Sequence, residues 1–558
     1  MAESRSLLAT NRTEVRGAAP QAILRRLRRF NVFLFATIIF ALAHTQSPLY
    51  YSNQHQYFLH GLAKAGLGNL QEDWLANTRD PTPVFSAVVE FTHRHLRDEA
   101  FYVYYAIIFG IYCFTLLSLF DFLAPNASFV MRLVFFTVLV AIHAAVARWA
   151  SVEYLDRDFP WYLQSGVAGQ YVLGPGLQPS VFGVLLVSSI VAFVRRRPYL
   201  AVLLADLAAI MHSTYLLIAA LVTLAYLILL IRERRFQIAI IAGLCSLWAV
   251  LPIVYYDWRN FGPSSAQEFE QAQTIVATIR IPHHAQVERW LDKTAAGQLI
   301  WIVAAWCWTW RTRLFPILSL LILFALALSL IQILTGSLTL ALLFPWRMSA
   351  VLMPIATTVI VARLLSFLDS RLHTAPLSAR VLTGGICCAA LAGLVIGGWT
   401  ISRKGLSYRV NSAEDGLLNF VHDHKQPGDI YLLPISIPKV GTGEKGSVST
   451  SFTPPPRPSP GSNLIPVDLQ RFRLSTGAPI FIDFKSIPYQ DREVWEWYTR
   501  LQIIHKLYEE SRWDSRETRE TLARHRITHV VTTAKQEIHS PHYELCYSDS
   551  QYRLYKVR

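Results

Sequence analysis

Long apolar segments separated by short polar stretches dominate the first 400 residues of the chain. Each segment approaches the roughly 20 residues that an α-helix needs to cross a bilayer. This pattern predicts a polytopic α-helical membrane protein with about eleven crossings. The segments lie at 30–44, 100–123, 128–149, 178–194, 199–211, 213–231, 236–256, 297–310, 314–334, 341–362 and 380–400.

Basic residues cluster at alternate ends of these segments. Because cytoplasmic loops carry the excess of Lys and Arg, we place every cluster, and the basic N-terminal stretch 1–29, in the cytoplasm. The opposite, exoplasmic side then receives loops 45–99, 150–177 and 257–296 and everything after residue 400, so that several loops can form one polar cavity. The clusters are Arg25/Arg26/Arg28/Arg29, Arg195–Arg197, Arg232/Arg234/Arg235, Arg311/Arg313 and Arg363/Arg371.

The remainder, 401–558, has the pattern of an exoplasmic soluble α/β domain. Residues Asp491–Glu510 have the apolar spacing of an amphipathic helix. Strands alternating with helices predict a mostly parallel sheet, and the Pro-, Gly- and Ser-rich stretch 441–463 predicts a disordered insertion. The expected strands are Asp429–Pro434, Pro479–Phe484, Ile527–Thr532 and a closing hairpin within Tyr543–Val557.

Composition supports the membrane assignment and excludes other classes. The 558 residues are 53% hydrophobic and only 16% charged, against about 25% charged in soluble domains. The net charge of +14 comes largely from the topological Arg clusters, and we expect no nucleic-acid partner. Five of the six cysteines lie in apolar segments, which leaves Cys546 alone in the soluble part. The cysteines therefore predict neither a disulfide framework nor a metal site.

The first loop gathers carboxylates, amides and aromatic residues beside apolar segments that carry few of them. Glu72, Asp73 and Asp80 are its first acidic residues, and one of them could serve as the base that takes a proton from an acceptor. A pair could instead hold a divalent cation such as Mg²⁺ or Mn²⁺ against a phosphate leaving group. In the alternative interpretation, Asp73 caps a short helix and Asp80 begins a turn at Pro81.

Two further groups could bind an anion. The third loop contains Arg280, His283, His284 and Arg289, where two histidines alone are weak evidence for zinc and the arginines favour a phosphate. Arg347 stands near the exoplasmic end of an apolar helix and needs a counter-charge, which a lipid phosphate would provide. The alternative for Arg347 is that it reaches the membrane interface beside Trp346.

One more polar residue stands at the tip of a helical hairpin. His212 could bind a ligand, but it could equally be a packing or capping residue.

This architecture resembles the GT-C superfamily of membrane glycosyltransferases, which take sugars from polyprenyl-phosphate donors. The similarity rests on the cytoplasmic N-terminus, the long acidic first loop, the number of crossings, the exoplasmic Arg and the C-terminal domain. Residues Phe472–Trp497 resemble the soluble tail of poorly characterised bacterial members. The resemblance implies a hexosyl or pentosyl transferase of the bacterial inner membrane and cell envelope, acting on a glycan, lipid or protein acceptor.

The chain departs from that family at one position. Many members place an acidic pair before a Tyr just after the first helix, whereas this chain has Asn53, Gln54 and then Tyr57. By analogy these residues line the cavity, while the His283/His284 pair and Arg347 face the donor phosphate. Either the base has moved to Asp73 or Asp80, or the protein is a non-catalytic assembly protein. A transporter or flippase for a lipid-linked solute is a further alternative.

Overall fold

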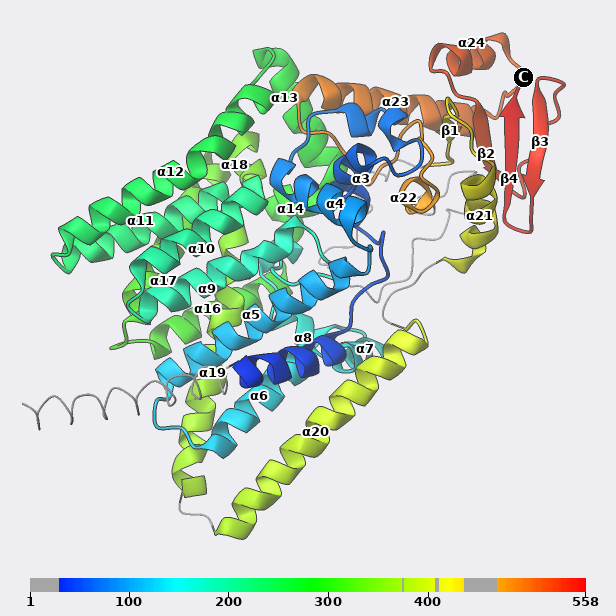
Figure 1. The fold of residues 1–558 in the computed structure, drawn as a ribbon. Helices are drawn as coiled ribbons and strands as arrows, with labels where there is room; N and C mark the ends of the chain where they lie inside the picture. The colour runs from blue at the N-terminus through cyan, green and yellow to red at the C-terminus, as the bar shows by residue number, and fades with distance from the viewer. Residues whose placement is uncertain (1–29, 374–375, 407–410, 436–468) are drawn as a thin grey trace, which may run out of the picture.

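The computed structural model describes residues 30–373, 376–406, 411–435 and 469–558 (Figure 1). A bundle of apolar helices carries a cap of shorter elements at one end, and a C-terminal domain packs beside that cap. The bundle consists of the helix Phe30–His44 and α5 (Ala100–Leu123), α6 (Phe129–His143), α7 (Ala145–Leu155), α9 (Val184–Val194), α10 (Pro198–Met211), α11 (Leu216–Arg232), α12 (Phe236–Phe261), α16 (Lys293–Trp308), α17 (Leu314–Thr335), α19 (Met348–His373) and α20 (Leu377–Arg403).

All eleven expected segments are helical, but fewer are long enough to be counted as spans. Six described helices, or seven if the bent pair of α6 and α7 counts as one, have the length and apolarity to cross a membrane. Phe30–His44, Pro179–Val194 and Pro198–Met211 are apolar but shorter. At 1.5 Å per residue they fall below the ~30 Å of a bilayer core. The chain is therefore a helical membrane protein, and the count of eleven crossings is not confirmed.

Basic residues of the predicted clusters that the structure describes lie at one end of the bundle. Arg313, before α17, forms a 3.1 Å ion pair with Glu233, which lies between α11 and α12. The guanidinium of Arg313 also lies 5.3 Å from the ring centroid of Phe193, at the end of α9. Arg363 donates to the carbonyl of Trp308, the last residue of α16, over 2.9 Å. The opposite ends of α11, α12 and α16 lead into the cap, as Figure 1 shows.

The cap is built from the three loops that the sequence places on the exoplasmic side, together with short elements at 179–183, 213–215 and 338–347. Most of its helices are short because the backbone changes direction after a few residues. Its elements are α2 (Gln54–Tyr57), α3 (Leu59–Ala65), η1 (Leu70–Glu72), η2 (Leu75–Asn77), α4 (Pro83–His95), α8 (Phe159–Tyr162), η3 (Val167–Gly169), η4 (Pro179–Gly183), η5 (Ser213–Tyr215), α13 (Ala266–Ile275), the π-helical turn η6 (Val276–Arg280), α14 (Pro282–Ala285), α15 (Val287–Trp290), α18 (Leu338–Leu342) and η7 (Pro345–Arg347).

The C-terminal domain has a four-stranded sheet in the order β1-β2-β4-β3. The pair β1–β2 is parallel, while β2–β4 and β3–β4 are antiparallel. The predicted helix Asp491–Glu510 is confirmed as α23. The elements are η8 (Ser412–Glu414), α21 (Asp415–His424), β1 (Tyr431–Leu432), α22 (Phe472–Thr476), α23, α24 (Arg516–Arg524), β2 (His529–Thr533), β3 (Tyr543–Ser548) and β4 (Tyr552–Val557).

Two expectations about this domain are wrong. The sheet is mixed rather than mostly parallel, because the closing hairpin supplies half of its strands and pairs antiparallel with β2. The segment Pro479–Phe484 forms a single bridge between Ile480 and Tyr431 instead of a strand. The Ile480 N–H donates to the carboxylate of Asp73 instead of to a neighbouring strand. The stretch 441–463 lies outside the described residues.

The C-terminal domain is joined to the first loop by a buried ion-pair triad. Arg473 donates through Nε to Asp73 over 2.8 Å and through Nη1 to Asp483 over 2.7 Å. All three side chains are almost fully enclosed. Close by, Gly68 and Gly477 both have positive φ, and their backbones touch, with Asn69 N–H donating to the Gly477 carbonyl. These contacts fix the domain over the end of the bundle.

Candidate functional site

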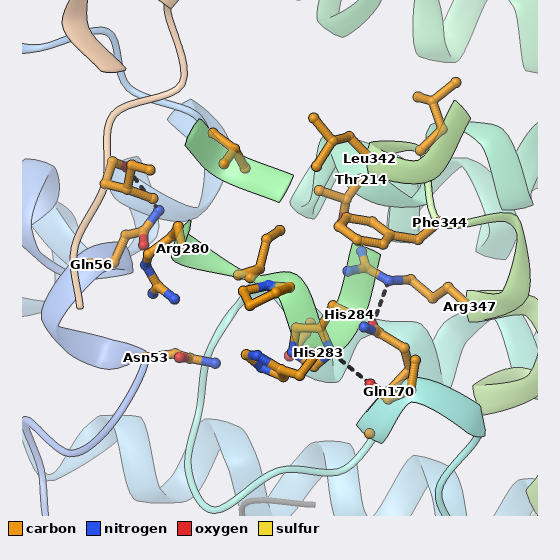
Figure 2. A pocket seen from close by; sticks show the side chains of 18 of the residues that line it. Asn53, Gln56, Gln170, Thr214, Arg280, His283, His284, Leu342, Phe344 and Arg347 are labelled. Carbon is orange, nitrogen blue, oxygen red and sulfur yellow. Dashed lines mark hydrogen bonds between the residues drawn. The ribbon is translucent and has the colours of Figure 1, made fainter. Parts of the chain in front are cut away.

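A cavity of about 1560 Å³ lies where the cap, the bundle and the C-terminal domain meet. It is lined by residues from each of the three expected exoplasmic loops, from the tip of the α10–α11 hairpin, from the turn before α19 and from the C-terminal domain. Figure 2 shows side chains from these separate elements pointing into the same space. Several of the expected loops therefore meet at one cavity.

Arg347 is the cation at the bundle side of the cavity. The turn η7 presents it, and Phe344 enters that turn in the left-handed region with φ 49°. Its Nε donates to Gln170 over 2.8 Å and its Nη1 donates to Thr214. The guanidinium carbon lies 4.7 Å from the Phe344 ring centroid. Arg347 forms no ion pair with any residue that the structure describes, so its two neutral partners leave its charge uncompensated.

A carboxylate that the sequence analysis did not select lies on the same wall. Asp257, in the last turns of α12, lines the cavity and hydrogen-bonds Ser213, while its Oδ1 is buried without a partner among the described residues. Ser213 precedes Thr214, the residue that holds Arg347. The turn η5 thus lies between the Asp257 carboxylate and the Arg347 guanidinium. No ion pair joins these two groups in the described structure.

His283 and His284 lie between the two ends of the cavity (Figure 2). Their ring centroids are 4.0 Å apart. Burial, with neighbouring cations, lowers the pKa of His283 to about 4 and holds the pKa of His284 well below its usual value. His284 Nδ1 lies 2.6 Å from the carbonyl oxygen of Ala168. Since a carbonyl only accepts, Nδ1 carries the proton and Nε2 of the neutral ring is left as an acceptor.

A second cationic group, Arg280 with Lys485, lies on the side of the C-terminal domain. Arg280 donates to the backbone carbonyl of Lys485 and lies 5.5 Å from the Phe484 ring centroid. Burial lowers the pKa of Arg280, and burial together with Arg280 lowers the pKa of Lys485 to about 7. The nearest carboxylate, Asp483, already accepts from Arg473 and from Ser486 N–H.

The first-loop carboxylates have structural contacts and do not line the cavity. Asp73 accepts from Arg473 and from three backbone N–H groups. Asp80 accepts from Thr82 N–H and Ser86 and pairs with Lys64 at 3.4 Å. This corrects the sequence-based assignment of the base. The alternative, in which these residues stabilise turns, agrees with the geometry.

Glu72, the third of these carboxylates, reaches the C-terminal domain. It is exposed and accepts from Gly428 N–H over 2.8 Å. It therefore contributes to docking of the domain and not to the cavity wall.

Most of the other predicted cavity residues do lie in the wall. Asn53, Tyr57, His212 and Arg289 all line it. The rings of Tyr57 and His212 meet edge to face at 5.6 Å, and burial lowers the pKa of His212 well below its usual value. Gln54 is the exception. It is buried outside the cavity, accepts from Tyr50 N–H and donates to the Leu177 carbonyl, which joins two loops.

The possible divalent cation lacks a set of ligands. Within the described ranges, no three His, Cys, Asp or Glu side chains are grouped so that they could hold a metal ion. Asp73 and Asp80, two of the carboxylates considered for such a site, each accept from several protein donors. The described residues therefore offer no preformed cage of three side chains for Mg²⁺ or Mn²⁺, and no reaction step is derived through one.

Comparison with known proteins connects the cavity wall to one domain family. Residues 461–504 match the domain of unknown function DUF6798. The described part of this match contains Arg473 and Asp483 of the buried triad and Lys485 of the cavity. No curated protein matches the chain. The matched segment is thus the part of the C-terminal domain that both docks on the first loop and closes the cavity.

Proposed function

We propose that this protein is an integral membrane glycosyltransferase that moves a sugar from a polyprenyl-phosphate donor to an exoplasmic acceptor. The observation that carries the proposal is the placement of Arg347 and Asp257 beside Thr214 and Ser213, two consecutive residues of one turn, with no ion pair between them in the described structure. Uncompensated charges in a cavity cost free energy, and functional sites are where proteins tolerate that cost.

The wall beside Arg347 fits a phosphate that carries an apolar chain. Leu216, Leu217, Leu342 and Leu343 line the same cavity as the arginine, and Leu343 is 45% exposed. A prenyl chain can leave between such residues toward the bilayer while its phosphate stays at the guanidinium. This arrangement favours a lipid phosphate over a soluble nucleotide.

In the proposed reaction, Arg347 binds the donor phosphate and Asp257 acts as the general base. The acceptor hydroxyl gives its proton to the Asp257 carboxylate as its oxygen bonds to the anomeric carbon. The bond between that carbon and the phosphate oxygen breaks, and its electron pair leaves with the polyprenyl phosphate. Arg347 stabilises the added negative charge on this leaving group.

The proposal places the protein in a bacterial inner membrane with its N-terminus in the cytoplasm. The cavity and the C-terminal domain then face the periplasm, because the basic clusters lie at the other end of the bundle. The acceptor, a glycan, lipid or protein, enters from that side.

Binding of polyprenyl phosphate to the protein in lipid nanodiscs tests the donor site. We expect Arg347→Met to weaken binding about 10- to 100-fold, the effect of losing a charged hydrogen bond of roughly 1.5–3 kcal/mol. Arg363→Met, a matched change at the other end of the bundle, leaves the affinity unchanged. Equal affinities of the wild type and Arg347→Met would refute a lipid phosphate at this arginine.

A non-catalytic assembly role is the second candidate. It is favoured by the first-loop carboxylates, all of which have structural contacts. Release of hexose from a polyprenyl-phosphate-linked hexose separates the two roles. Turnover that is lost in Asp257→Asn while lipid-phosphate binding persists supports transfer. Binding without turnover in the wild type, across hexose and pentose donors, supports the assembly role.

A further inference from the structure

Two cations without carboxylate partners occupy the wall that the C-terminal domain contributes. Arg280 and Lys485 both line the cavity and are joined through the Lys485 carbonyl. Neither forms an ion pair with a described residue, and Arg280 Nε is buried without a hydrogen-bond partner in that part of the chain. Adjacent buried cations repel each other and lose hydration, so an anion is required to stabilise them.

Two carboxylates of the C-terminal domain near this cationic group already have other partners. Asp483, two residues from Lys485, is held by Arg473 within the buried triad. Asp491, also in the cavity wall, accepts from the N–H and hydroxyl of Ser264. A ligand is therefore the available source of negative charge.

This cationic group is separate from Arg347. Figure 2 shows Arg280 and Arg347 on opposite sides of the His283/His284 pair. His283 experiences the charges of Arg280, Lys485 and Arg289, whereas His284 experiences those of Arg347 and Lys485. Both rings are neutral, so the positive charge of the cavity lies in two places, one on either side of the histidine pair.

We propose that Arg280 and Lys485 form a second anion subsite, which binds a carboxylate or phosphate group on the carbohydrate substrate. The inference rests on the proposed function for its carbohydrate ligand. The first subsite, at Arg347, takes the lipid phosphate, and the second recognises an acidic group on either the transferred sugar or the acceptor. The DUF6798 match then marks a segment that selects the substrate.

The accessibility of Lys485 to a small acylating reagent tests the subsite. The full chain in nanodiscs is treated with acetic anhydride near pH 7.5, and acetylation of each lysine is followed by mass spectrometry. The probes are D-glucuronate and, as a neutral analogue of the same shape, D-glucose. Exposed Lys535 serves as the internal control lysine.

We expect glucuronate, and not glucose, to slow acetylation of Lys485 while Lys535 reacts at the same rate. Arg280→Met should weaken this protection about tenfold, the loss of one charge-assisted hydrogen bond. Equal rates in glucuronate and glucose would overturn the proposal. So would equal protection by unglycosylated polyprenyl phosphate, because Lys485 would then belong to the lipid-phosphate site.

A second arm distinguishes the two sources of the acidic group and separates this inference from the proposed function. If glucuronate still protects Lys485 after polyprenyl-phosphate-linked glucose is bound, the acidic group belongs to the acceptor. If the bound donor blocks glucuronate, the group belongs to the transferred sugar. Failure of polyprenyl phosphate to bind at all refutes the glycosyltransferase, yet leaves glucuronate protection intact.

Discussion

Replacing Asp73 by Asn tests whether this buried carboxylate holds the C-terminal domain or performs chemistry. Asp73 Oδ2 accepts from Arg473 Nε at 2.8 Å and from Ile480 N–H at 3.0 Å. Its Oδ1 accepts from the N–H groups of Leu75 and Ala76 at 2.9 and 3.3 Å. Since donors surround both oxygens, either orientation of an amide places its NH₂ against N–H groups.

The magnitude follows from this geometry. Asp73→Asn removes one charge from a fully enclosed triad and leaves hydrogen-bond donors unsatisfied. Breaking a buried ion pair from one side costs about 3–5 kcal/mol. We therefore expect local opening between the first loop and the C-terminal domain to become at least roughly 10²-fold more frequent.

Hydrogen–deuterium exchange in nanodiscs measures this opening, at the amides of residues 74–76 and 478–482. Glu72→Gln is the matched control, because exposed Glu72 makes one hydrogen bond to Gly428 N–H, and we expect a change within about 0.5 kcal/mol. Unaltered exchange in Asp73→Asn, together with lost sugar transfer, would refute the structural role and restore Asp73 as a catalytic candidate.

Three further predictions follow from the site and its supports. Gly68→Ala should destabilise domain docking by about 1–3 kcal/mol, because its Cβ would collide with the Gly477 carbonyl; Gly66→Ala, with positive φ but open space, is the control in the same exchange assay. The affinity for glucuronate should fall as pH rises through about 7 in a binding titration, because Lys485, beside Arg280 and Asp483, then loses its charge; a pH-independent affinity up to pH 9 would contradict this. Asp257→Asn should leave lipid-phosphate affinity within about twofold, as a base that does not touch the phosphate would, and reduced binding in that variant would place Asp257 in the phosphate site instead.

Residues of the third loop and the turn before α19 can be assigned to the cavity from the sequence because their chemistry is visible in the chain. Arg280, His283, His284, Arg289 and Arg347 stand out against apolar surroundings, and all five line the cavity. A charged side chain beside a membrane segment is costly enough that its presence indicates a specific environment.

Asp257 and Lys485 show the limit of that reasoning. Asp257 lies in Tyr255-Tyr256-Asp257-Trp258-Arg259, which reads as the polar end of a membrane helix, and its partner Ser213 is 44 residues away in sequence. The available signal was an isolated acidic residue at the end of an apolar helix. Lys485 lies two residues after Asp483, and the sequence allows two interpretations, an acceptor contact or a strand-end salt bridge; in the structure Asp483 pairs with Arg473 instead.

The sequence by itself determined the helical segments, the shared end of the basic clusters, the amphipathic helix α23 and the identity of the loops that meet. Periodicity and charge placement decide these features locally, through the bilayer and the helical repeat. Only the tertiary structure decided which carboxylate faces the cavity. Asp73 and Asp257 are the same residue type, but Arg473, 400 residues from Asp73, neutralises one, while the other lies in the cavity wall beside the Ser213 hydroxyl. Contacts between segments so distant in sequence leave no periodic trace in either of them.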